Sequence, residues 1–484
     1  MSDQHKANSA QQFRAPLMVL VISLLTSAVL MAVVWVYNPD YLRDSSACRM
    51  SDAGAYLRLA RNLIDHGRYS RCPAEPYLPE HLYPPVYPLV IGILDRIGGA
   101  SAIYAVQALL RAGTCLLVYL IGKRIISERA GFWAGLFMSL DIYFLVYSLL
   151  ILSETVFVFL LVAGVALGLS ALHGRDSSPN AGKKLLRSAG AGVLLGLATL
   201  TRPQGLYLPL VLAIACVMVA WRGGYLRRAV VYATIMLATA YVVTGVWAVR
   251  DVVHFSKPFI NSDIVLVYCA SVSAHRHHAG ISEEEARARI IEEFGLPPLE
   301  QMHNPHRFGR DLPGIVQDVN AISSAKWKLL SRYPLSLAQS CVRGSLKASV
   351  GHPLGAFAMM LGRPWVNPGT QDLIFSPSRA WARVFENTPP VWLLFVFHVA
   401  FAPCFLILAA AGIIGMFCNR PTRSAAVVLL ILTGYFYLTL AMAGSGTDDR
   451  YRLPAFVFLC FFAGWTASRA VEVYRNWRSP AKPS

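Results

Sequence analysis

Long apolar runs that carry almost no charge recur along the whole sequence and constrain its fold more than any other feature. Of the 484 residues, 55% are hydrophobic and only 15% are charged, whereas about a quarter of a soluble protein is charged. Inside a bilayer every backbone polar group must be satisfied within the segment, which favours helices. The sequence therefore predicts an all-α polytopic membrane protein.

The apolar runs divide into about ten spans of membrane-crossing length, with up to twelve if shorter stretches are counted. The first has no small-residue cleavage site and continues into "WVYNPDY", so we interpret it as a retained span rather than a removed signal peptide. The expected spans are 15–37, 102–122, 131–150, 154–172, 188–201, 206–221, 229–249, 390–417, 424–443 and 454–470.

Basic residues cluster in alternate connections, which predicts the orientation in the membrane. "GKRIISER", "HGRDSSPNAGKKLLR", "WRGGYLRR", "CNRPTR" and the C-terminal tail are rich in Lys and Arg, as cytoplasmic loops are. Both termini are then cytoplasmic, in a bacterial inner or plasma membrane. The net charge of +17 is explained by basic residues in cytoplasmic loops and by basic residues that contact anionic lipid headgroups. We therefore expect no nucleic-acid partner.

This orientation leaves two long loops on the outer side, 38–101 and 251–389. We divide the chain accordingly into an N-terminal membrane module with a catalytic first loop (1–250), an outer loop region with short helices (251–389), and a C-terminal membrane module with a cytoplasmic tail (390–484). The first loop contains several arginines of its own, among them Arg43, Arg49, Arg58, Arg61, Arg68 and Arg71. Loops of this length largely escape the positive-inside rule.

Two short amphipathic segments lie in the first outer loop. From Asp52 to His66, apolar residues recur at helical spacing and Gly67 supplies the stop. Asp52 can be interpreted as a helix N-cap or as a carboxylate that takes a proton from an attacking hydroxyl. The second segment, "YPPVYPLVIGILDRIGG", is apolar for only about 13 residues, which is typical of an interfacial or re-entrant helix.

Acidic and basic residues gather at the expected outer ends of the spans. A carrier would place such residues near the bilayer midplane, whereas an active site at the outer boundary would gather them here. Each arginine in the set can be an interfacial anchor or a ligand for phosphate, and Glu154 either begins a helix or binds an acceptor or a metal. The set is Asp52, Glu154, Arg202, Arg250, Asp251, Asp448, Asp449, Arg450 and Arg452.

Other polar features receive structural interpretations. Arg111 and Asp141 lie near the middle of neighbouring spans, which predicts a buried structural pair. The tract "HRHHAG" at 275–278 lacks a Cys or an acid at ligand spacing, so we expect a flexible loop rather than a metal site. The outer loops hold Cys48 with Cys72 and Cys269 with Cys341, and the sequence leaves open whether either pair is a disulfide.

The order of the motifs resembles a known superfamily. An acid heading the helix at Asp52 is followed by "YPPVYPLVIGIL", "LILSETVF", "TRPQGL", "RDVVHFSKPF" and "DDRYRLPAF". This order resembles the GT-C superfamily of polyprenyl-phosphate-sugar glycosyltransferases, in the group of protein O-mannosyltransferases and the lipid A aminoarabinose transferase. The chain departs from the pattern with one acid at Asp52 instead of a pair, with Asp251 where asparagine is common, and with "NSD" at 261–263.

The resemblance implies a GT-C bundle and an integral-membrane glycosyltransferase that moves a sugar from a polyprenyl-phosphate donor to a hydroxyl acceptor on the outer face, with inversion. It implies no certain cofactor and leaves a divalent metal open. The alternatives are a transporter or flippase of a lipid-linked substrate, and an O-antigen ligase or polymerase. The predicted site comprises catalytic Asp52 and Glu154, phosphate-binding Arg202, Arg250, Arg450 and Arg452, and pocket residues Tyr56, Tyr83, Tyr87, Asp448 and Tyr451, with no metal ligands.

Overall fold

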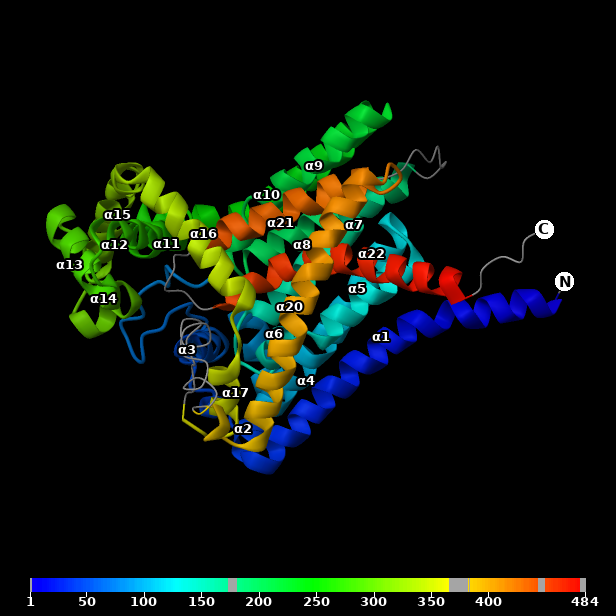
Figure 1. The fold of residues 1–484 in the computed structure, drawn as a ribbon. Coiled ribbons are helices and arrows are strands. Elements are labelled where there is room, and N and C mark those ends of the chain that lie inside the picture. The colour runs from blue at the N-terminus through cyan, green and yellow to red at the C-terminus, as the bar shows by residue number, and fades with distance from the viewer. Residues whose placement is uncertain (1, 173–180, 365–381, 383, 443–448, 479–484) are drawn as a thin grey trace.

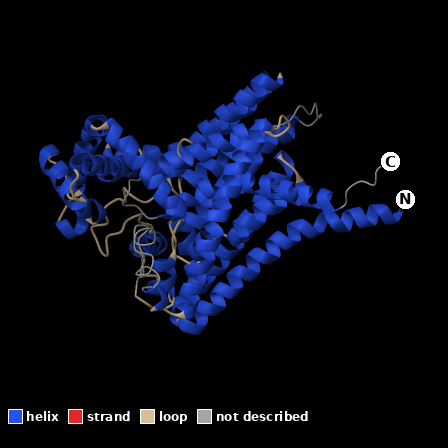
Figure 2. Ribbon diagram, viewed as in Figure 1, coloured by secondary structure: helices blue, strands red, loops and turns tan. Residues whose placement is uncertain are grey.

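The computed structural model describes residues 2–172, 181–364, 382, 384–442 and 449–478. Every regular element among them is a helix or a helical turn, as Figure 2 shows, and the predicted all-α class is confirmed. The long helices form a bundle, and the shorter ones gather at one end of it, while both chain termini lie toward the other end (Figure 1).

The bundle contains helices long and apolar enough to cross a membrane. Eight spans meet that description within the described residues, the first running from Arg14 to Tyr37 and the last from Arg450 to Arg478. The bundle helices are α1 (Ser2–Tyr37), α4 (Val86–Ile125), α5 (Glu128–Leu140), α6 (Ile142–Tyr147), α7 (Glu154–Leu172), α8 (Ala181–Thr199), α9 (Leu208–Gly223), α10 (Leu226–Phe255), α20 (Pro389–Cys418), α21 (Arg423–Met442) and α22 (Leu453–Arg478).

Two of the ten expected spans do not meet the criterion of length and apolarity. The run at 131–150 is divided at Asp141, which ends α5 after 13 residues and accepts a hydrogen bond from the Phe144 amide at the start of α6. The run at 188–201 is the apolar half of α8, whose first turns carry Lys183, Lys184 and Arg187. Both segments still pack inside the bundle, α5 against α4 and α22, and α8 against α7 and α10.

The segment expected to be interfacial or re-entrant is the first part of α4. That helix runs for 40 residues with a break at Gly98 and Gly99, where the backbone leaves helical geometry. Gly99 has φ +60° and ψ −152°, a conformation that essentially only glycine adopts. The break separates residues 86–97, which pack on α3 (Ser51–His66), from the expected span at 102–122.

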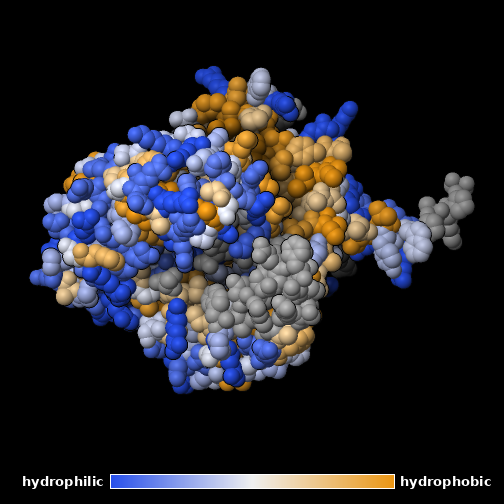
Figure 3. Space-filling model, turned by 60° about the vertical axis from the view of Figure 1, so that its left-hand side comes forward, coloured by the Kyte–Doolittle hydropathy of each residue, from blue (hydrophilic) through white to orange (hydrophobic). Residues whose placement is uncertain are grey.

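One end of the bundle carries the short helices and their own apolar core, and we call it the outer end after the predicted orientation. In Figure 3, hydrophilic residues cover this end and hydrophobic residues cover the bundle, as expected where water meets a bilayer. Besides α3, its elements are α2 (Pro39–Arg43), η1 (Ser45–Ala47), η2 (Pro203–Gly205), α11 (Ile260–Val265), η3 (Leu266–Ser271), α12 (Val272–Ala279), α13 (Glu283–Phe294), α14 (Leu299–His303), η4 (Pro305–Phe308), α15 (Leu312–Arg332), α16 (Pro334–Val350), α17 (Leu354–Met360) and η5 (Asp449–Arg452).

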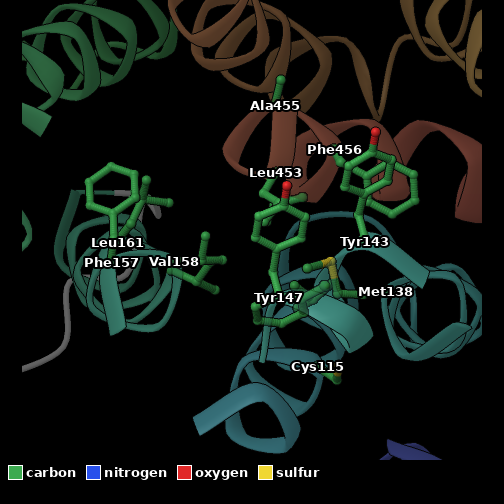
Figure 4. Packing of buried hydrophobic residues seen from close by; sticks show 14 of the residues in the cluster. Cys115, Met138, Tyr143, Tyr147, Phe157, Val158, Leu161, Leu453, Ala455 and Phe456 are labelled. Carbon is green, nitrogen blue, oxygen red and sulfur yellow. The ribbon is translucent and has the colours of Figure 1, made fainter. Parts of the chain in front are cut away.

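In the bundle core, the N-terminal half of the chain packs against the last helix. Figure 4 shows Tyr143 beside Phe456 and Tyr147 beside Leu453, so that α6 packs against the start of α22. All four side chains are less than 9% exposed. Each such apolar side chain contributes about 1.5–3 kcal/mol when it is fully buried. This packing fixes the first turn of α22, and with it η5, against the N-terminal half of the bundle.

Candidate active site at the outer end of the bundle

A cavity of about 470 Å³ opens at the outer end of the bundle, where segments distant in sequence converge. The first outer loop, the turn after α8, the start of the second outer loop, α21 and η5 all contribute to its wall. The lining residues are Asp52, Tyr56, Leu82, Tyr83, Pro84, Thr201, Arg202, Pro203, Gln204, Tyr207, Asn261, Ser262, Ile264, Val265, Leu266, Tyr268, Cys269, Leu299, His303, Tyr435, Leu438, Thr439, Met442, Arg450 and Tyr451.

Asp52 lies in the first turn of α3 and faces this cavity. It is not the N-cap, because Met50 occupies that position without a side-chain capping bond. Its carboxylate accepts a hydrogen bond from the Tyr83 hydroxyl at 2.9 Å and from the Arg450 guanidinium at 2.8 Å. The acid is therefore oriented by one neutral donor and one charged donor.

The surroundings of Asp52 keep its carboxylate ionised. Burial by itself would raise the pKa of Asp52. The charge of Arg450, hydrogen bonds from Arg450 and Tyr83, and the charge of Arg202 together outweigh burial and hold the pKa of Asp52 below its ordinary value. At neutral pH the group can accept a proton and has none to donate.

Glu154 is the first residue of α7 and sits beneath the cavity floor with a side chain only 3% exposed. Its Oε1 lies 2.5 Å from an Arg202 nitrogen and 3.5 Å from Arg450 Nε. The adjacent Ser153 hydroxyl lies 3.1 Å from the Tyr56 hydroxyl and accepts a hydrogen bond from Arg202 at 3.3 Å. One buried acid thus holds two guanidinium groups together.

Tyr451 is positioned between the same two arginines. The guanidinium carbon of Arg202 is 4.9 Å from its ring centroid, and that of Arg450 is 5.6 Å away, both in cation–π range. Arg202 and Arg450 line the cavity and their side chains are 10% and 11% exposed. Two partly desolvated guanidiniums side by side are suited to binding a phosphate through charge-assisted hydrogen bonds.

The opposite wall of the cavity is apolar and belongs to the membrane part of the bundle. Leu438 and Met442 come from α21, and Tyr207 immediately precedes α9. Leu438 and Tyr207 are each 60% exposed although they line the cavity, so this wall continues onto the lipid-facing surface. A polar headgroup site and an apolar path out of it therefore share one cavity.

Three residues of the predicted site lie outside the cavity, and a fourth is not among the described residues. Arg250 donates hydrogen bonds to the Glu80 carbonyl at 2.5 Å and to Asp251 at 2.9 Å, with its charge over the Trp247 ring. Tyr87 is fully buried behind Tyr56 and bonds to Gln107. Arg452 points into the bundle, and Asp448 is outside the described residues.

Arg111 and Asp141 are both buried, as predicted, and their charges act on each other, but no ion pair within 4 Å joins them. Asp141 is ion-paired with Arg452 at 3.1 Å. Arg111 instead donates to hydroxyls and a carbonyl on α1 and to the Ser139 carbonyl, and it makes no ion pair with any residue that the structure describes. An arginine in the middle of a bundle can be satisfied by backbone and hydroxyl oxygens alone.

Several cavity residues were not predicted from the sequence. Asn261, Tyr268 and His303 come from the long second outer loop, and Gln204 and Tyr435 come from the segment after α8 and from α21. "NSD" at 261–263 was noted only as a departure from the family pattern. Gln204 lies in the motif "TRPQGL", where only Arg202 was assigned a role. The remaining three are ordinary polar or aromatic residues whose sequence context gives no signal, because only the fold brings them to the cavity.

The described residues also include histidines and cysteines, which are the side chains that bind metals or form disulfides. Within the part of the chain that the structure describes, no group of three or more His, Cys, Asp or Glu residues could hold a metal ion. The expectation of a flexible loop at 275–278 is wrong, because these residues form the last turns of α12 and His278 stacks on Tyr333 with ring centroids 3.9 Å apart. All nine cysteines are free thiols.

Comparisons with known proteins agree with this geometry. Residues 83–247 match the family model of dolichyl-phosphate-mannose-protein mannosyltransferases, a match that includes Tyr83, Glu154 and Arg202. No curated protein matches the sequence.

Solved structures with a similar fold include the oligosaccharyltransferase AglB from Archaeoglobus fulgidus, in complex with an inhibitory peptide and a dolichol-phosphate. That match has 17% identity and a TM-score of 0.52, covering 98% of this chain and 53% of the archaeal one. The apo form of the archaeal enzyme matches with 15% identity and a TM-score of 0.52, covering 97% and 52%. ArnT from Cupriavidus metallidurans bound to undecaprenyl phosphate matches with 15% identity, covering 95% and 81%, and its TM-score of 0.36 is too low to carry an argument.

The chain spans about half the length of the archaeal enzyme that it resembles. The family match and the fold confirm the predicted resemblance to the GT-C superfamily of glycosyltransferases. The chain is therefore a multi-pass membrane protein with a GT-C fold.

The ion pair of Glu154 and Arg202 gives a prediction about stability. We expect a double-mutant cycle of Glu154→Gln and Arg202→Gln to give a coupling free energy above about 1 kcal/mol, because breaking a buried pair strands a charge. The measurement is thermal or denaturant unfolding of the detergent-solubilised protein.

The matched control is the pair of Arg289 and Glu285 on α13, whose side chains are 54% and 49% exposed. An exposed helical pair of this kind should couple by only about 0.3–0.5 kcal/mol. Equal coupling energies for the two pairs would show that Glu154 does not hold the site together.

Proposed function

We propose that the chain is a glycosyltransferase that moves a sugar from a polyprenyl-phosphate donor to a hydroxyl acceptor at the outer face of the membrane. The observation that carries the proposal is one cavity that combines an ionised carboxylate, Asp52, with two guanidiniums, Arg202 and Arg450, and an apolar wall. The coarser class, a GT-C glycosyltransferase, rests on the family match and the fold.

The polar part and the apolar wall of the cavity together indicate the chemical class of the donor. A prenyl chain cannot leave the bilayer cheaply, since each buried methylene contributes roughly 0.8 kcal/mol. The wall of Leu438, Met442 and Tyr207 suits such a chain, and Arg202 and Arg450 suit a phosphate at headgroup depth. The similar archaeal structure contains dolichol-phosphate, which supports a lipid phosphate as the donor's carrier.

The chemistry follows from where charge develops. The acceptor hydroxyl attacks the anomeric carbon, the bond from that carbon to the phosphate oxygen breaks, and the lipid monophosphate leaves. Arg202 and Arg450 stabilise the charge that grows on the phosphate. Asp52 takes the hydroxyl proton as the new glycosidic bond forms, which is general base catalysis. Direct displacement of this kind inverts the configuration at the anomeric carbon.

Glu154 acts in this scheme through the arginines. It is enclosed by Arg202, Arg450 and Ser153 and does not line the cavity. We assign it the role of positioning the two guanidiniums.

We propose that the site lies on the extracytoplasmic side of the membrane and that both termini are cytoplasmic. The basic connections between the spans support this orientation.

The first test is Asp52→Asn in purified protein reconstituted in lipid vesicles, assayed for sugar transfer from a polyprenyl-phosphate-sugar. Loss of a general base should lower kcat by about 10²–10⁴-fold. Donor binding, measured by thermal stabilisation with undecaprenyl phosphate, should persist because Arg202 and Arg450 remain.

The matched control is Asp65→Asn, which alters the other acid of α3. Asp65 pairs with Arg96 and its side chain is 34% exposed. This variant should keep activity within a few-fold of the wild type. A folded Asp52→Asn enzyme that transfers sugar at near wild-type rate would show that another group takes the proton.

The pH dependence of the reaction provides a second test. Because the folded pKa of Asp52 is lowered, the base stays ionised as pH falls and activity is lost only below the ordinary range of an aspartate. Arg450→Gln removes the largest force that opposes burial, so the acid limb of the kcat/KM profile should move to higher pH. Tyr83→Phe, which removes one hydrogen bond, should move it less.

An acid limb at the same pH in the wild type and in Arg450→Gln would contradict the assignment of that limb to Asp52. Two other functions would give different outcomes. A flippase would move a lipid-linked substrate across the membrane without forming a glycosidic bond. A ligase of the O-antigen type would prefer a lipid diphosphate over a lipid monophosphate as competitor.

A further inference from the structure

The transfer chemistry leaves unexplained a group of basic residues at the edge of the cavity. Arg58 on α3 and Arg71 in the following loop belong to the arginine-rich first outer loop. They meet His303, His306 and Arg307 from α14 and η4 in the second outer loop. We call these five residues the cation rim.

The two loops are joined at the cation rim by specific contacts. Arg71 is ion-paired with Glu80 and donates a hydrogen bond to the His303 carbonyl. A ring nitrogen of His81 lies 3.0 Å from the Met302 carbonyl. The two segments therefore hold a fixed position relative to each other, and the rim is part of the folded structure rather than a chance meeting of mobile side chains.

Tyr83 connects the cation rim to the proposed base. The guanidinium carbon of Arg71 lies 5.1 Å from the Tyr83 ring centroid, and the hydroxyl of the same tyrosine donates to Asp52. His303 lines the cavity together with Asp52. The cation rim therefore reaches the cavity through His303.

The charges of the cation rim are only partly compensated. Arg71 is ion-paired with Glu80, and the negative charges of Glu300 and Asp52 lie near enough to His303 to favour its charged form. Arg58 and Arg307 are exposed and have no acidic oxygen at ion-pairing distance among the described residues. They are the two rim residues with charge left to bind a ligand.

The rim residues also disfavour one another's charge. Partial burial and then the charges of Arg71 and Arg307 lower the pKa of Arg58. Burial followed by the charges of Arg71, Arg58 and Arg307 lowers the pKa of His306. Like charges held together in this way are stabilised when an anion binds between them, through charge-assisted hydrogen bonds.

We infer that the cation rim binds a phosphate or carboxylate group on the acceptor, and that the protein glycosylates an anionic acceptor whose attacking hydroxyl lies near that group. The inference rests on the proposed function and names the substrate class of the same site. The donor phosphate has its own ligands, Arg202 and Arg450, which come from the turn after α8 and from η5. Two separate anion sites near one base would align donor and acceptor.

The test uses the full-length protein in nanodiscs of zwitterionic phosphatidylcholine, with inorganic pyrophosphate as the probe and undecaprenyl phosphate present to occupy the donor site. Calorimetry should show pyrophosphate binding whose Kd rises about tenfold or more in the double variant R58Q/R307Q. The matched control R61Q/R68Q changes two other arginines of the same loop and should leave Kd within about twofold. Equal binding by the wild type and R58Q/R307Q would overturn the inference.

A residue-level measurement covers the case in which R58Q/R307Q fails to fold. Modification of wild-type arginines by phenylglyoxal, read by peptide mass spectrometry, should slow at Arg58 and Arg307 when pyrophosphate is added, and not at Arg61 and Arg68. Absence of protection would overturn the inference. So would equal protection by phosphatidylglycerol nanodiscs without pyrophosphate, because the rim would then be a lipid-headgroup site.

The anionic acceptor and the proposed transferase are refuted by different results. Stabilisation by undecaprenyl phosphate that depends on Arg202 and Arg450, without pyrophosphate binding at the rim, would refute the anionic acceptor and leave the proposed transferase. Loss of both would remove the proposed function itself.

Discussion

The structure at the outer end of this protein depends on one buried carboxylate. Glu154 starts α7 at the edge of the apolar core and neutralises Arg202, which follows α8, and Arg450, which precedes α22. An unpaired charge at this depth would cost several kcal/mol, so the three groups must come together once the helices pack. Arg450 then extends this cluster to Asp52 on α3. The cavity is defined by that convergence.

The other buried charges must also be compensated, but their partners differ from those of the site. Arg111 is satisfied by hydroxyls and carbonyls, and Arg452 is paired with Asp141 while its guanidinium carbon lies 3.8 Å from the Tyr143 ring centroid. The cavity beside Arg452 holds only about 10 Å³. These groups bind one another or the backbone inside the bundle, and the space beside Arg452 is too small for a ligand. Asp52, Arg202 and Arg450 face a cavity large enough for a sugar, which favours surface transfer over transport through the midplane.

Much of the fold could be predicted from hydrophobicity, because the bilayer requires long apolar helices. The exceptions have local causes. The run at 131–150 is apolar throughout except for Asp141, which accepts a hydrogen bond from the Phe144 amide at the start of α6 and is ion-paired with Arg452 of η5. The break in α4 at Gly99 is visible in the sequence as a glycine pair, but glycine inside a span has several uses.

A site residue could be predicted from the sequence when its position did not depend on tertiary contacts. Asp52, Arg202 and Arg450 lie next to the ends of spans, so the order of the spans was enough to bring them to one end of the bundle. Arg250 satisfied the same rule, yet the Glu80 carbonyl and Trp247 hold it outside the cavity. The contribution of the second outer loop, including His303, depends on how that loop folds back, and no periodicity in the sequence encodes this.

The most direct measurement of the central claim is an experimental structure of the protein with undecaprenyl phosphate. The account predicts the phosphate within roughly 3 Å of the guanidinium nitrogens of Arg202 or Arg450, the hydrogen-bonding distance for such a pair, with the prenyl chain leaving along α9 and α21. A phosphate bound elsewhere, with the cavity beside Asp52 unchanged, would contradict it.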